Sequence, residues 1–127
     1  MYISKAGAAD ISQAAGTDMW RFEAPAAGKL KVTGCMINWT EATGAMTVDG
    51  VVSVKVAGTE VGTCTPSDSN TIGDSDLFVV DGTAATSTNP YVNFAAGDAI
   101  LVEVKTQATD NVTGDGICFL DVEFATD

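Results

Sequence analysis

The chain has 127 residues, a formal net charge of −11 and no histidine. The length fits one domain, and the lack of histidine excludes Ser-His-Asp triads, Cys-His pairs and histidine-ligated metals. Six scattered Lys and Arg residues against seventeen Asp and Glu residues cannot build the basic patch that nucleic acid requires. Because 46% of the residues are hydrophobic, we expect a folded chain rather than a disordered one.

The first residues are rich in Ala and Gly and contain no long apolar run. We therefore expect neither a signal peptide nor a membrane span, and we expect the protein to be made in a cytoplasm. Tyr2 to Lys5 could form a short strand, and the following residues could form a loop, a short helix or an extended arm. Residues 1–19 are thus interpreted as an N-terminal arm or first strand, and residues 20–127 as a single β-sandwich domain.

From residue 20 onward, apolar and polar side chains alternate with the period of two that is typical of half-buried strands. Trp20 and Phe22, for example, alternate with Arg21 and Glu23. Short runs of this kind, separated by turn residues, predict strands over residues 20–23, 29–39, 51–57, 60–65, 77–80, 91–94, 99–106 and 116–124.

Two of these segments allow finer predictions. Within residues 29–39, Leu30, Val32 and Met36 are expected to share one face. Residues 51–65 are the clearest hairpin, and Gly58-Thr59 at its tip suits a two-residue type II′ turn. No window has helical periodicity, so the sequence predicts an all-β, antiparallel jelly-roll or β-sandwich of about eight short strands.

The three cysteines, Cys35, Cys64 and Cys118, lie in apolar runs and show no C-x-x-C spacing. This pattern favours buried free thiols over a disulfide framework or a thiolate metal site. A single bridge or an intersubunit thiol remains the alternative.

The polar loop after Pro66 begins like a calcium-binding EF-hand, with oxygen ligands at its first and third positions and Gly73 at the sixth. It departs from that motif at Ile72 and Val79, where an EF-hand has oxygen ligands. An oxygen site of another kind remains open, as does a loop whose side chains cap their own backbone. The candidate ligands are Asp68, Asn70, Asp74 and Asp76.

No arrangement of residues suggests a catalytic mechanism. There is no G-x-S-x-G motif and no histidine base, and the many carboxylates are typical of a solvated surface. We therefore expect no enzymatic activity and no cofactor, with a small metal-dependent hydrolase as the least favoured reading. Trp39 closes a strand before a loop, so it could stack on a sugar or a protein neighbour, although core filling is the commoner role.

Three stretches resemble the jelly-roll decoration (cement) proteins of tailed-phage capsids, which have kin among head fibres. Phe22 to Leu30 (FEAPAAGKL) is similar to their first strand, turn and second strand. Val54 to Val61 (VKVAGTEV) is similar to their Gly-Thr hairpin, and Phe94 to Val104 (FAAGDAILVEV) to their Gly-Asp turn into a late strand.

This resemblance implies a homo-oligomer, with a trimer favoured, on the outer capsid surface of the virion. Its partner would be the major capsid protein, and it would clamp neighbouring capsid subunits without nucleic acid or membrane. Tyr2 and Ile3 in an arm that orders on docking, together with Trp39, are the expected partner-binding residues. The alternative is a carbohydrate- or receptor-binding module of a phage tail or bacterial surface that uses Trp39, Tyr91 and the polar loops.

Overall fold

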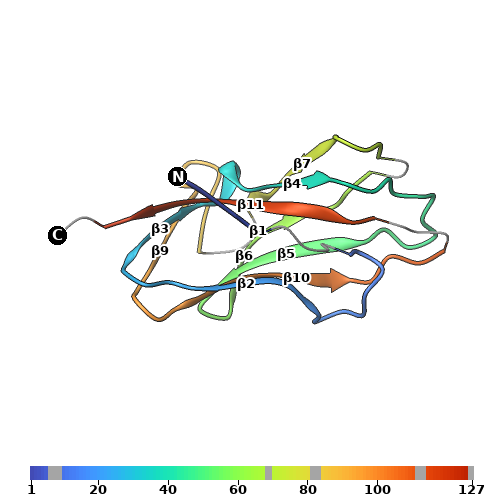
Figure 1. The fold of residues 1–127 in the computed structure, drawn as a ribbon. Coiled ribbons are helices and arrows are strands. Elements are labelled where there is room, and N and C mark those ends of the chain that lie inside the picture. The colour runs from blue at the N-terminus through green and yellow to red at the C-terminus, as the bar shows by residue number, and fades with distance from the viewer. Residues whose placement is uncertain (6–9, 68–69, 81–83, 111–113, 126–127) are drawn as a thin grey trace.

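A computed structural model describes residues 1–5, 10–67, 70–80, 84–110 and 114–125. They form two antiparallel sheets packed as a sandwich (Figure 1), which confirms the predicted fold class. The elements in chain order are β1 (Tyr2–Lys5), β2 (Asp18–Glu23), β3 (Gly28–Lys31), the 3-10 helix η1 (Val32–Gly34), β4 (Met36–Trp39), β5 (Val51–Val56), β6 (Thr59–Cys64), β7 (Ser75–Leu77), β8 (Val79–Val80), β9 (Tyr91–Phe94), β10 (Ala99–Thr106) and β11 (Gly116–Phe124).

The six-stranded sheet is organised around β11. Strands β3 and β4 pair one after the other along the same side of β11, and β1 pairs along its opposite side. Beyond them, β9 pairs with β3 and β7 pairs with β4. Three strands of this sheet, β1, β7 and β9, therefore lie at its margins.

The five-stranded sheet has the order β2-β10-β5-β6-β8. Its alternation follows the sequence prediction: Val52, Val54 and Val56 of β5 are buried, as are Ile100 and Val102 of β10. These side chains meet the inward residues of the other sheet in one continuous apolar core.

The predicted strand over residues 29–39 is interrupted by η1, and this changes which face Met36 occupies. Leu30 pairs with Val122 and Met36 with Phe119. Leu30 and Met36 are six residues apart, whereas their partners on β11, Val122 and Phe119, are only three apart. Residues three apart on one strand face opposite ways, and paired residues share a face. Met36 therefore lies on the opposite face of the sheet from Leu30. Leu30 and Val32 are buried as expected, but Met36 faces outward, and Ile37 and Trp39 point into the core instead.

The predicted hairpin over residues 51–65 is present, but its turn lies one residue earlier than expected. Val56 pairs with Thr59, which leaves Ala57 and Gly58 as the two loop residues. Both have positive φ, at 49° and 81°, which is the pattern of a type I′ turn rather than the type II′ turn that the sequence suggested.

The described N-terminal residues are part of the sandwich. Besides the pairing of β1 with β11, Ile11 is fully buried in the core. Its backbone bridges two other segments, because Ile11 N–H donates to the Gly114 carbonyl and Ala108 N–H donates to the Ile11 carbonyl.

The predicted strand over residues 77–80 crosses from one sheet to the other. Leu77 is the last residue of β7 in the six-stranded sheet, and Val79 is the first residue of β8 in the five-stranded sheet. Phe78 between them is 1% exposed, so its ring closes the core on this side of the sandwich.

Candidate binding face

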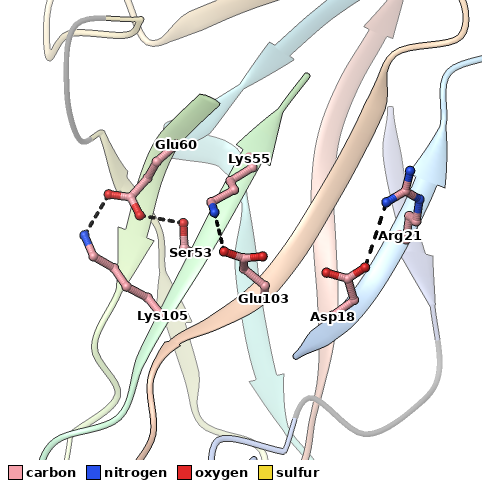
Figure 2. Close-up of polar contacts among 7 residues, drawn as sticks. All are labelled: Asp18, Arg21, Ser53, Lys55, Glu60, Glu103 and Lys105. Carbon is pink, nitrogen blue, oxygen red and sulfur yellow. Dashed lines mark hydrogen bonds and ion pairs between the residues drawn. The ribbon is translucent and has the colours of Figure 1, made fainter. Parts of the chain in front are cut away.

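The two sheets present very different outer faces. On the five-stranded sheet, long charged side chains from β5, β6 and β10 pair with one another across strands (Figure 2). Lys55 of β5 forms an ion pair with Glu103 of β10. Glu60 of β6 accepts from Lys105 Nζ at 2.7 Å and from Ser53 Oγ at 2.8 Å.

These paired side chains cover the outer face of the five-stranded sheet. Ser53 faces outward from β5, yet it is fully buried beneath its neighbours. Towards the β2 edge, Arg21 lies 3.9 Å from Asp18 and 3.7 Å from Glu23. The hydrocarbon stems of such side chains shield the strands while their charged ends stay in water. A partner on this face would have to displace ion pairs that already satisfy one another.

The outer face of the six-stranded sheet is apolar over the half formed by β1, β11, β4 and β7. The register places Ser4, Phe119, Met36 and Leu77 side by side in one row across these strands. Ile117 follows Phe119 on the same face of β11. We call the set Tyr2, Met36, Leu77, Ile117 and Phe119 the apolar face.

The apolar face is hollowed. Tyr2, Met36, Asn38 and Phe119 line a shallow depression of about 320 Å³. Tyr2, which lines it, is 56% exposed, and Leu77, which pairs with Met36, is 58% exposed. An open, mostly apolar depression between strands is the kind of surface on which proteins contact other proteins.

Tyr2 owes its position to the pairing of β1 with β11, in which it lies opposite Asp121. The N-terminal amine lies 3.5 Å from the Asp121 carboxylate, and Val122 N–H donates to the Met1 carbonyl. Gly34 leaves room for the Asp121 side chain, because a Cβ at position 34 would lie 2.5 Å from Asp121 Oδ2.

The structure separates the three predicted partner-binding residues. Tyr2 lies on the apolar face, whereas Ile3 points inward and packs against the core. Trp39 is fully buried, and this corrects its proposed role at the surface: its ring has no exposed face for a sugar or a protein to stack on. The reason is the reversal at η1, which turns Trp39 inward and Met36 outward.

The sequence prediction missed Met36 and Phe119 as residues of the apolar face. An uninterrupted alternation across residues 29–39 would place Met36 on the same buried face as Leu30 and Val32. Phe119 alternates with the buried Cys118 and Leu120, and this alternation was the one available hint that a large apolar side chain points outward from β11.

The candidate metal ligands have other partners in the structure. Asp68 lies outside the described residues. Asp76 Oδ2 accepts from Trp39 Nε1 at 2.7 Å and also from the Asn70 amide. Asp74 Oδ2 accepts from the backbone N–H of Thr71 at 2.9 Å, which is a loop side chain capping its own backbone.

Within the described residues, no group of three or more His, Cys, Asp or Glu side chains is placed to hold a metal ion. The three cysteines are buried and free, as the sequence predicts. Burial raises the pKa of each thiol to about 12, so these groups are protonated and poorly nucleophilic near neutral pH.

Tyr91, the other exposed aromatic considered for a sugar, is 40% exposed on β9. Lys29 Nζ lies 5.0 Å from the centre of its ring, which is within the range of a cation–π contact. A sugar would have to displace this lysine before it could stack on the same face of the ring.

Comparisons with known proteins identify no relative: no family model, no curated protein and no solved structure matches this chain. In the part of the chain that the structure describes, no helix is long and apolar enough to cross a membrane.

Proposed function

We propose that this protein is a non-enzymatic virion structural protein that decorates and stabilises a tailed-phage capsid. It binds across subunits of the major capsid protein through the apolar face of its six-stranded sheet. The observation that supports this proposal is the contrast between an open apolar face on one sheet and a face covered by its own ion pairs on the other. The resemblance of residues 22–30, 54–61 and 94–104 to capsid decoration proteins supplies the partner.

The energetics favour the apolar face as the docking surface. Burial of apolar surface contributes roughly 25 cal/mol per Å², and Phe119, Met36 and Leu77 offer such surface in one row. Docking through the opposite face would remove water from Lys55 and Glu103, which costs free energy without creating new pairs.

Stabilisation of the capsid follows from mass action. A protein that binds only the assembled lattice shifts the equilibrium towards assembly. A homo-oligomer, with a trimer favoured, would present several apolar faces at one symmetry axis and so convert weak contacts into avid binding. Sedimentation equilibrium of the purified protein tests the oligomer separately from capsid binding.

The capsid-binding experiment is co-sedimentation with expanded empty capsids assembled from the major capsid protein of the phage that carries this chain. The wild type is expected to co-sediment, and Phe119→Glu is expected to bind at least about tenfold more weakly, equivalent to a loss of about 1.4 kcal/mol. Arg21→Glu is the matched control, because it adds a carboxylate on the opposite face.

Thermal unfolding of both variants checks that the fold persists. Wild-type protein that stays in the supernatant would contradict the proposal, as would equal binding by Phe119→Glu and Arg21→Glu. Two observations disfavour the alternative of a glycan-binding module. Trp39 is buried, and Lys29 lies over the ring of Tyr91.

A further inference from the structure

A second surface adjoins the apolar face along the segment of residues 70–80, which we call the β7–β8 edge. Among the residues that the structure describes, seven large hydrophobic side chains are exposed, and three of them lie in this segment. Ile72 is 72% exposed, Val79 is 61% exposed and Leu77 is 58% exposed. Three exposed aliphatic side chains within eleven successive residues are typical of a surface that binds another protein.

The backbone of β7 is available for further pairing. Trp39 N–H donates to the Asp74 carbonyl at 2.8 Å, and Phe78 N–H donates to the Cys35 carbonyl at 2.9 Å. Because hydrogen-bonded and non-bonded residues alternate along an antiparallel strand, Ser75 and Leu77 direct their backbone groups away from β4. These groups can accept an additional strand.

The other marginal strands carry the charges or prolines that usually discourage such pairing. Arg21 on β2 lies between two carboxylates. Strand β9 follows Pro90, and Lys29 covers its Tyr91. Strand β1 ends with Lys5. Residues 70–80 contain no Lys, Arg or Pro, and Asp76, the one charged residue of β7, directs its carboxylate to Trp39 Nε1.

The β7–β8 edge is also held in one conformation. Phe78 is anchored in the core, Asp76 accepts from Trp39, and Asn38 Nδ2 donates to Ser75 Oγ at 3.0 Å and to the Gly73 carbonyl at 3.2 Å. A preorganised strand binds with less loss of conformational entropy than a mobile one.

The charges of this segment indicate what would pair with it. Asp74 and Asp76 are its two described ionisable residues, and a second copy of the chain, with its own net charge of −11, would bring further carboxylates against them. A strand that carries Lys or Arg would meet the exposed Asp74 with complementary charge, whereas the half-buried Asp76 carboxylate already accepts from Trp39 and Asn70.

We propose that the β7–β8 edge binds an extended segment of a different protein, with alternating apolar and basic side chains, as an added strand beside β7. The apolar side chains pack beside Leu77 and extend the row formed by Phe119 and Met36. This inference goes beyond capsid decoration. It states the chemistry of a segment that binds beside β7, and it does not depend on whether that segment belongs to a capsid protein.

The test is amide hydrogen exchange, measured by NMR, in the presence of a capped seven-residue peptide in which Val and Lys alternate. A Val–Glu peptide of the same length is the charge control. The Val–Lys peptide is expected to slow exchange at Ser75 and Leu77 by roughly threefold or more, and the Val–Glu peptide is expected to have no effect. Leu77→Lys and, as a second variant, Val79→Lys should abolish this protection, whereas Tyr91→Lys on the β9 edge should retain it.

Thermal unfolding identifies any variant that fails to fold. The proposal is overturned if neither amide is protected, if the β2 or β9 edge is protected equally, or if the Val–Glu peptide acts as well as the Val–Lys peptide. Protection of Ser75 and Leu77 without peptide, rising with protein concentration alongside dimer formation, would assign the edge to a second copy and overturn it too. Failure of capsid co-sedimentation leaves this test intact, because no capsid is used.

Discussion

The indole nitrogen of Trp39 donates a hydrogen bond of 2.7 Å to the carboxylate of Asp76. This contact joins the last residue of β4 to the centre of β7. The same carboxylate accepts from the Asn70 amide, and Asn70 N–H donates to Thr43 Oγ1 at 2.7 Å. Trp39, a candidate for stacking at the surface, and Asp76, a candidate metal ligand, are therefore partners in one hydrogen-bond network.

Removing the acceptor should destabilise the fold. We expect Asp76→Ala to lower the free energy of unfolding by about 1–3 kcal/mol, because the buried Trp39 N–H loses its partner. Asp76→Asn keeps an oxygen in place and should cost less. Chemical denaturation measures both, with the exposed Glu123→Ala as the control that changes stability by less than about 0.5 kcal/mol. Equal stability of Asp76→Ala and wild type would show that the hydrogen bond contributes nothing.

Calcium should have little effect on this network. Asp76 and Asp74 already accept from Trp39 and Thr71, so an ion would have to displace these donors. We expect the midpoint of thermal unfolding to be the same in millimolar calcium and in EDTA. A rise in the midpoint with calcium that Asp74→Asn removes would instead establish an oxygen site in this loop.

The buried position of Ile11 predicts that the N-terminal segment contributes to global stability. Ile11→Ala should cost about 2–5 kcal/mol, as is usual for a fully buried aliphatic side chain. Ile72→Ala is a control of the same chemistry at a position that is 72% exposed, and it should change stability by less than about 0.5 kcal/mol. If Ile11→Ala were as mild as Ile72→Ala, residues 10–19 would behave as a detachable arm.

The cysteines should be protected from reagents and should make the fold sensitive to alkali. Burial raises the pKa of Cys35, Cys64 and Cys118 to about 12, from about 9.0 for a thiol in water. Between these two values the unfolded chain loses thiol protons that the folded chain retains, so the free energy of unfolding falls as the pH rises.

Two measurements check this expectation. At pH 8 a thiol reagent should react slowly with the native protein and quickly with three thiols in denaturant. The Cys35→Ala, Cys118→Ala double variant should lose less stability between pH 9 and pH 11 than the wild type does. Rapid labelling of the native protein would contradict the buried assignment.

Local sequence patterns predicted much of the fold because strand alternation depends on near neighbours. The buried faces of β5, β10 and β11 follow directly from alternating Val, Ile, Leu and Cys residues. The hairpin of β5 and β6 was also predictable, although its turn is formed by Ala57 and Gly58, which both adopt positive φ. The neighbouring Gly58-Thr59 pair is an equally acceptable turn sequence, so the local pattern could not choose between them.

The apolar face could not be predicted in the same way. Whether Met36 or Trp39 reaches the surface depends on how many residues η1 takes up, and that number is fixed by the pairing of β3 and β4 with the distant β11. The partnership of Trp39 with Asp76 likewise depends on β7 pairing with β4.

Length and composition predict a single folded domain, and the absence of histidine excludes the histidine-dependent catalytic mechanisms. Alternation then determined that it is a sandwich of antiparallel strands, since the period of two is a local property of the backbone. Only the tertiary structure decided which outer face is sealed by Lys55, Glu103, Glu60 and Lys105 and which is left apolar. Those faces are assembled from strands far apart in sequence, and their register arises from long-range pairing.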